Sequence, residues 1–124
     1  HVDTFNARRR EVAARYNELL QGIPGLVLPP LAEGHVFHQY TVRISAGRDR
    51  VAEELASKGI GTMVYYPVPL HRLPVYGYPE GTLPEAQRAA QEVLSLPISP
   101  YINGEQIGHV VRQAKDILVR KWAF

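Results

Sequence analysis

The stretch His35-Val36-Phe37-His38-Gln39-Tyr40-Thr41-Val42-Arg43-Ile44 is the part of the sequence that decides the fold. Side chains that are mainly apolar alternate along it with others that are mainly polar, which is the period of a β-strand with one buried face. One face of this strand would carry Val36, His38, Tyr40, Val42 and Ile44. We therefore predict a strand over residues 35–44. The flanking segments of the sequence must then pack against its apolar face.

Helical patterns flank this strand on both sides. Apolar residues recur at helical spacing over residues 3–20, with Asp3 or Thr4 placed to cap the first turn. A second helix is expected over residues 48–58, and a third begins at Pro84, which suits a first helical turn. The last helix follows Asn103 and Gln106, whose spacing of three is that of a capping box.

Two further strands are expected, over residues 60–66 and 94–98, because both segments are short and rich in apolar residues. Residues 67–83 lie between them with four prolines, so an irregular but stiff loop is predicted there. The resulting order α-β-α-β-loop-α-β-α contains a split βαβ pattern. It predicts an α/β (α+β) fold: a small, mainly antiparallel sheet of three to four strands with helices packed on one face.

Length and composition bound the function. A chain of 124 residues fits a single domain over residues 1–124, and its opening on His1 suggests part of a longer protein. Fourteen basic against twelve acidic residues, with no concentrated basic face, argue against nucleic acid as a partner. No apolar run is long enough for a membrane span and no signal peptide is apparent, so a cytoplasmic location without membrane binding is expected. The absence of cysteine excludes disulfides, thiolate zinc sites and cysteine nucleophiles.

Histidine is the side chain best suited to acid-base chemistry near neutral pH. His1 and His109 are expected on the surface, and His38 is expected as a hydrogen-bonded histidine in the core. His71 is the sharper candidate, because it follows Tyr65-Tyr66-Pro67-Val68-Pro69-Leu70 on an exposed, proline-stiffened loop. No metal site is predicted, since residues three apart on a strand, such as His35 and His38, point to opposite faces.

Covalent chemistry finds no support in the residues themselves. None of the serines lies in a nucleophile elbow. Lys58, Lys115 and Lys121 fall at a helix end or on an exposed helical face, whereas a lysine that forms a Schiff base needs a desolvated pocket. We therefore predict no catalytic residue within this chain.

Four groups of residues in order resemble the C-terminal portion of the DegT/DnrJ/StrS family of nucleotide-sugar aminotransferases. The resemblance covers nearly the whole chain. These groups are Asn6-Ala7-Arg8-Arg9-Arg10 with Ala14-Arg15-Tyr16; residues 35–43; Gly59-Ile60-Gly61-Thr62 with Tyr66-Pro67-Val68-Pro69-Leu70-His71; and Leu94-Ser95-Leu96-Pro97-Ile98.

The resemblance implies a pyridoxal-phosphate (PLP) enzyme of the aspartate-aminotransferase fold type, dimeric, which moves an amino group from glutamate to a nucleotide-linked keto sugar. In that family the cofactor's lysine lies in a large N-terminal domain, which this chain lacks. The chain would be the small domain alone, inactive by itself and without bound cofactor.

The same resemblance implies substrate-binding roles for several residues. His71 and Leu70 would belong to the turn that reaches the active-site cleft, with His71 touching substrate and Tyr65 and Tyr66 lining the same wall. His38 would support that wall, and Arg43 would clamp the carboxylate of the amino donor. The alternative left open is a freestanding split-βαβ module that binds a small ligand or mediates association.

Overall fold

The computed structural model describes residues 1–122, and it confirms the α+β class. Its sheet has three antiparallel strands in the order β1-β2-β3. The helices are α1 (Val2–Leu20), α2 (Arg48–Ser57), α3 (Pro84–Glu92) and α4 (Gly104–Trp122); the strands are β1 (Leu26–Val27), β2 (Tyr40–Ile44) and β3 (Val93–Leu96).

The split βαβ pattern is present around β3. Tyr40 of β2 pairs with Leu96 on one side of β3, while Met63 forms a single antiparallel bridge with Ser95 on the other side. Both neighbours run antiparallel to β3 and are therefore parallel to each other, with α2 in the connection between them. The predicted topology is thus confirmed, with β3 inserted between the two parallel segments.

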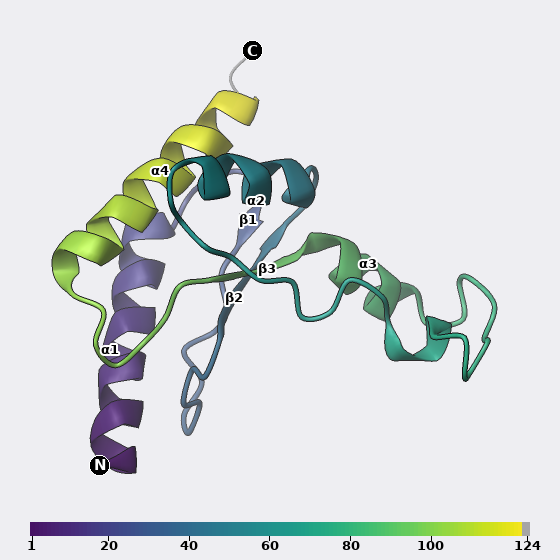
Figure 1. Ribbon diagram of the computed structural model, residues 1–124, viewed down its shortest axis with the longest axis horizontal. Helices are drawn as coiled ribbons and strands as arrows, with labels where there is room; N and C mark the ends of the chain where they lie inside the picture. The colour runs from purple at the N-terminus through teal and green to yellow at the C-terminus, as the bar shows by residue number, and fades with distance from the viewer. Residues whose placement is uncertain (123–124) are drawn as a thin grey trace.

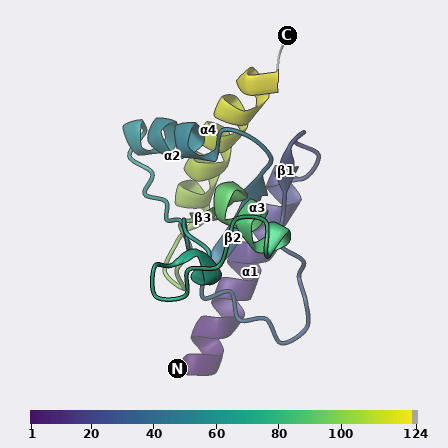
Figure 2. The same cartoon turned by 90° about the vertical axis from the view of Figure 1, so that its right-hand side faces the viewer.

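The core lies between the sheet and the helices α1, α2 and α4. α1 and α4 lie side by side, whereas α3 lies on the other side of the sheet, so the expectation that the helices pack on one face is wrong for α3 (Figures 1 and 2). Alternate residues of β2 face the core, and helical stripes cover them. The buried side chains include Val12, Tyr16 and Leu20 of α1; Tyr40, Val42 and Ile44 of β2; Val51 and Leu55 of α2; and Ile107, Val111, Ala114, Ile117 and Leu118 of α4.

The strand expected over residues 35–44 is shorter than predicted. β2 begins only at Tyr40, because Phe37 adopts a positive φ of 50° and its N–H donates to Nδ1 of His35 at 2.9 Å. This local turn reverses the expected faces at residues 36–38 only, while Tyr40, Val42 and Ile44 are buried as predicted. Phe37 is buried, whereas Val36 and His38 are exposed, so the prediction of a core histidine at position 38 is wrong.

The strand expected over residues 60–66 is also wrong, since only Met63 pairs with β3. The next antiparallel partners would be Gly61 with Pro97 and Tyr65 with Val93. Pro97 has no N–H to donate. At Val93 the N–H already donates to the carbonyl of Ala89, and the carbonyl accepts a 2.7 Å hydrogen bond from Nη1 of Arg48. Both extensions of the ladder are therefore blocked.

The helix boundaries follow the sequence closely. Asn103 and Gln106 form the predicted capping box, with reciprocal hydrogen bonds of 3.0 and 2.8 Å. Pro84 opens α3 as expected. The expected cap at Asp3 or Thr4 is wrong, because α1 begins at Val2 and no side chain caps it. Strand β1 was not expected from the sequence; Leu26 pairs with Ile44.

Two buried tyrosines join α1 to the sheet. The ring centroids of Tyr16 and Tyr40 are 4.8 Å apart. The hydroxyl of Tyr16 donates to the carbonyl of Pro97 at 2.7 Å, and the hydroxyl of Tyr40 donates to Oδ1 of Asn17 at 2.6 Å. Burial raises the pKa of Tyr16 above its ordinary value; burial, and then repulsion from Tyr16, raises the pKa of Tyr40.

No described helix is long and apolar enough to cross a membrane.

The role of Arg48 is tested by replacement with alanine. Arg48 is only 7% exposed, and its loss leaves the carbonyl of the half-buried Val93 without this partner. We expect Arg48→Ala to lower the free energy of unfolding by about 1–3 kcal/mol in urea melts. The control is Arg50→Ala, which removes an exposed ion pair with Glu54 and should cost below about 0.5 kcal/mol. Equal losses in the two variants would contradict the assignment.

The tyrosine pair predicts a loss of stability in alkali. Because the phenols have a raised pKa in the folded state, the unfolded chain loses their protons first, from about pH 10. Their contribution is complete below that pH and is lost as the pH rises towards the folded-state pKa. Urea melts at increasing pH should show a shallower decline for Tyr16→Phe than for the parent protein. An unchanged slope would refute this origin; Tyr101→Phe is the control for an exposed ring.

Candidate functional site

A small pocket of about 160 Å³ lies where the start of β2, the Met63 bridge and the end of β3 meet. It contains two of the residues predicted to bind substrate, His38 and Tyr65. Polar and apolar side chains share its wall, which suits a ligand held by hydrogen bonds over an apolar base. The lining residues are His38, Gln39, Gly61, Thr62, Met63, Tyr65, Ser95, Leu96, Pro97 and Ile98.

The wall of the small pocket is held by short-range contacts to the sheet. The N–H of Met63 donates to the carbonyl of Ser95 at 3.2 Å, and the N–H of Ser95 donates to the carbonyl of Met63 at 2.8 Å. On the same strand, the hydroxyl of Ser95 lies 2.8 Å from that of Thr41, and Tyr16 holds the carbonyl of Pro97. Part of the wall is therefore anchored on β3 through the Met63 bridge, while His38, Gln39 and Tyr65 lie on irregular segments.

After Val64 the chain leaves the sheet as a projecting segment, here called the arm (residues 64–83). The arm extends away from α1 and α4 and returns into α3 (Figure 1). It is irregular, as predicted, apart from one 3₁₀ turn, η1 (Leu70–Arg72). Its exposed apolar side chains include Tyr65, Tyr66, Val68, Leu70, Val75, Tyr76, Tyr78 and Leu83. So many exposed apolar side chains on one short segment are typical of an interaction site.

His71 lies in η1, and the expectation that it is an exposed loop residue is wrong. Its side chain is 9% exposed, and its Nε2 has no hydrogen-bond partner. Its carbonyl accepts the N–H of Tyr78 at 3.2 Å, and the guanidinium of Arg72 donates to the carbonyl of Tyr78 at 2.9 Å. These contacts close the turn after η1, and the imidazole is buried within it.

The other predicted residues are spread along the arm and the sheet. Tyr66 and Leu70 are exposed on the arm. Arg43 lies on β2, where its Nε and Nη2 contact Oε2 of Glu92 at 2.8 and 2.7 Å. Thus the structure brings His38 and Tyr65 into one pocket, but it does not place Arg43 among its lining residues.

Sequence reasoning missed several polar residues at the pocket. Gln39, Thr62 and Ser95 line it, and Ser95 is buried. The available signal was the serine within an otherwise apolar strand, residues 94–98. A buried hydroxyl on such a strand requires a partner, which Thr41 supplies.

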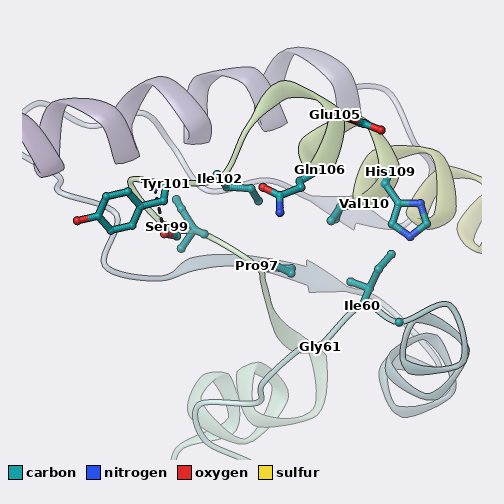
Figure 3. A pocket seen from close by; sticks show the side chains of 12 residues that line it. Ile60, Gly61, Pro97, Ser99, Tyr101, Ile102, Glu105, Gln106, His109 and Val110 are labelled. Atoms are coloured by element: carbon teal, nitrogen blue, oxygen red, sulfur yellow. Dashed lines mark hydrogen bonds between the residues drawn. The ribbon is translucent and has the colours of Figure 1, made fainter.

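A second and larger hollow, here called the groove, has a volume of about 730 Å³. It runs between the N-terminal half of α4 and the segments Gly59–Gly61 and Pro97–Ile102 (Figure 3). Gly61, Pro97 and Ile98 line both hollows. The groove and the small pocket are therefore neighbours on one surface.

The residues of the small pocket and the groove are suited to binding and positioning a ligand. A lysine that holds PLP as a Schiff base must be sheltered. Lys58 and Lys115, the lysines whose side chains the structure describes, are both exposed, so neither fits this cofactor. Nor do the described residues include a group of three His, Asp or Glu placed to hold a metal ion. Imidazole and hydroxyl groups at the pocket can nonetheless bind a polar ligand.

The comparisons with known proteins place the fold in one class, the sugar aminotransferases. The chain is 41% identical to dTDP-3-amino-3,4,6-trideoxy-alpha-D-glucose transaminase of Streptomyces venezuelae, over 99% of this chain and 32% of the relative. It is 48% identical to the "Pleiotropic regulatory protein" of Geobacillus stearothermophilus, over 94% of this chain and 33% of the relative. The crystal structure of S. venezuelae DesV with a ketimine intermediate matches at a TM-score of 0.85 and 41% identity, over 97% of this chain and 32% of DesV.

The DegT/DnrJ/EryC1/StrS aminotransferase family matches residues 1–115, and the chain belongs to this family. The predicted resemblance is thereby confirmed. The chain spans about a third of the length of the relatives it matches. Another solved relative, NtdA of Bacillus subtilis, contains the cofactor PMP; it matches at a TM-score of 0.79 and 27% identity, over 93% of this chain and 28% of NtdA.

Proposed function

We propose that the chain is the C-terminal small domain of a PLP-dependent enzyme that transfers the amino group of glutamate to a nucleotide-linked keto sugar. The observation that carries this proposal is the family match over residues 1–115, joined to a TM-score of 0.85 with a sugar aminotransferase of 41% identity. Membership of the family supports the reaction class. The glutamate donor, the homodimer and the missing N-terminal domain rest on the family resemblance.

Within that enzyme, this chain would position substrate. PLP, when bound, supplies the electron sink for the transfer, and its lysine would belong to the remainder of the protein. His38 and Tyr65 would contact the sugar nucleotide from the small pocket, and Tyr66, Leu70 and His71 would present the arm to the cleft. The exposed apolar side chains of the arm support a role at a surface that another part of the assembly covers.

Arg43 would bind the carboxylate of the amino donor while it keeps its ion pair with Glu92. Its guanidinium already contacts Glu92 on a single oxygen, which leaves N–H groups for a second carboxylate. Arginine is suited to such paired binding because its N–H groups form a planar fork. Glu92 would then hold the guanidinium in place while the donor binds.

The isolated chain tests the division of roles. Lys58 and Lys115 are exposed and offer no sheltered amine, and the side chain of Lys121 lies outside the described residues. We expect no stoichiometric absorbance band of a lysine aldimine when PLP is added to the chain, and no transamination. Circular dichroism should first show the chain to be folded. Lys115→Ala serves as the control for nonspecific imine formation at the surface. A specific, saturable one-to-one band would contradict the proposal and favour a freestanding ligand-binding module.

His71 is tested in the full-length protein. We expect His71→Asn to lower kcat by about tenfold or more, through loss of a substrate contact. Since the ring is buried, a modest fall in the melting temperature should accompany it. Arg72→Ala is the matched control, because it opens the same turn but keeps the imidazole. Unchanged turnover in His71→Asn, or an equal loss in both variants, would remove His71 from the substrate site.

A further inference from the structure

The chain is bent at Phe37, directly before the two residues that reach the small pocket from the side of β2. Phe37 has a φ of 50°, a backbone conformation that residues with a bulky side chain rarely adopt. Its ring is buried, with its centroid 6.5 Å from that of Tyr40. His38 and Gln39 follow and line the pocket. The bend therefore sets the position of this wall of the pocket.

The side chain of His35 holds the bend. Its Nδ1 accepts the N–H of Phe37 at 2.9 Å, and the two rings stack with their centroids 3.9 Å apart. An imidazole nitrogen accepts a hydrogen bond only through a lone pair, so the hydrogen of the neutral ring lies on Nε2. This arrangement matches an Asx turn, in which a side-chain acceptor binds the N–H two residues further on. His35 is exposed and is not among the lining residues of the pocket.

The alternating pattern of residues 36–44 favours a different conformation. An extended backbone at Phe37 would place His38 on the same face as Tyr40, towards the core. The structure has the reverse arrangement, with Phe37 buried and His38 exposed at the pocket. Two interactions select the bend: the burial of the Phe37 ring, and the hydrogen bond from its N–H to His35. Without the acceptor at position 35, the backbone at Phe37 is free to relax towards the extended form.

We propose that His35 is a positioning residue of the substrate pocket, which acts through the N–H of Phe37 to keep the side chain of His38 at the pocket. This inference rests on the proposed function, because that function makes the small pocket part of the substrate site. His35 itself contacts no substrate. Its acceptor nitrogen contributes to the binding of the nucleotide-linked keto sugar and leaves the transfer of the amino group unchanged.

Substitutions in the full-length protein separate the hydrogen bond from the ring stack. His35→Asn keeps an acceptor, because Oδ1 of asparagine and Nδ1 of histidine both lie two bonds from Cβ. His35→Phe keeps a ring that can stack on Phe37 but has no acceptor. Val36→Ala is the control for a general disturbance of the segment, since Val36 is an exposed neighbour that does not line the pocket.

The kinetic readout is the separation of KM from kcat. We expect His35→Phe to raise the KM for the keto sugar at least about fivefold and to change kcat by less than about twofold. His35→Asn and Val36→Ala should stay within about twofold of the parent protein in both constants. Hydrogen exchange of the Phe37 amide should be at least about tenfold faster in His35→Phe than in the other proteins. A parent-like KM in His35→Phe, or an equal rise in His35→Phe and His35→Asn, would overturn the proposal.

A second readout measures the position of His38 without turnover. The NMR resonance of its imidazole, identified by its loss in His38→Asn, should coincide in the parent protein and His35→Asn and should move in His35→Phe. An unmoved resonance in His35→Phe would overturn the proposal and leave the proposed function intact. If the parent protein transaminates no keto sugar, the proposed function is refuted, and the resonance alone then decides whether His35 positions His38.

Discussion

The backbone of Val93 sets the limit of the sheet, and the arrangement of the site depends on that limit. The N–H of Val93 donates to the carbonyl of Ala89, and its carbonyl accepts a hydrogen bond from the buried Arg48. Pairing on this side of β3 therefore ends at the bridge between Met63 and Ser95. The chain must leave the sheet there, and it becomes the arm. The two hydrogen bonds of Val93 together leave Tyr65 without a ladder partner, and the chain from Tyr65 onward lies on the projecting arm.

Local patterns in the sequence were sufficient for the helices. The capping pair Asn103 and Gln106 and the proline at position 84 act within one turn, so their effect can be predicted from spacing alone. The strand ends could not be predicted in this way. They depend on contacts that alternation does not encode, namely the hydrogen bond from Phe37 to His35 and the bond from Arg48 to Val93.

At the candidate site too, local sequence patterns predicted some features, while contacts between distant residues set the others. The residues of the arm could be chosen from the sequence because they carry the family motif, yet the motif does not indicate burial, and His71 proved to be enclosed. The partner of Arg43 comes from the end of α3, which no sequence pattern links to β2. The small pocket and the groove share Gly61, Pro97 and Ile98, so a change at these residues alters both hollows.

The central claim is that this chain positions substrate within a longer aminotransferase. The most direct measurement uses the complete protein with PLP, glutamate and a panel of nucleotide-linked keto sugars, followed by mass spectrometry of the sugar product. The account predicts formation of 2-oxoglutarate together with a sugar in which an amino group has replaced the keto oxygen. A complete protein that binds no PLP, or that leaves every keto sugar unchanged in the presence of glutamate, would contradict it.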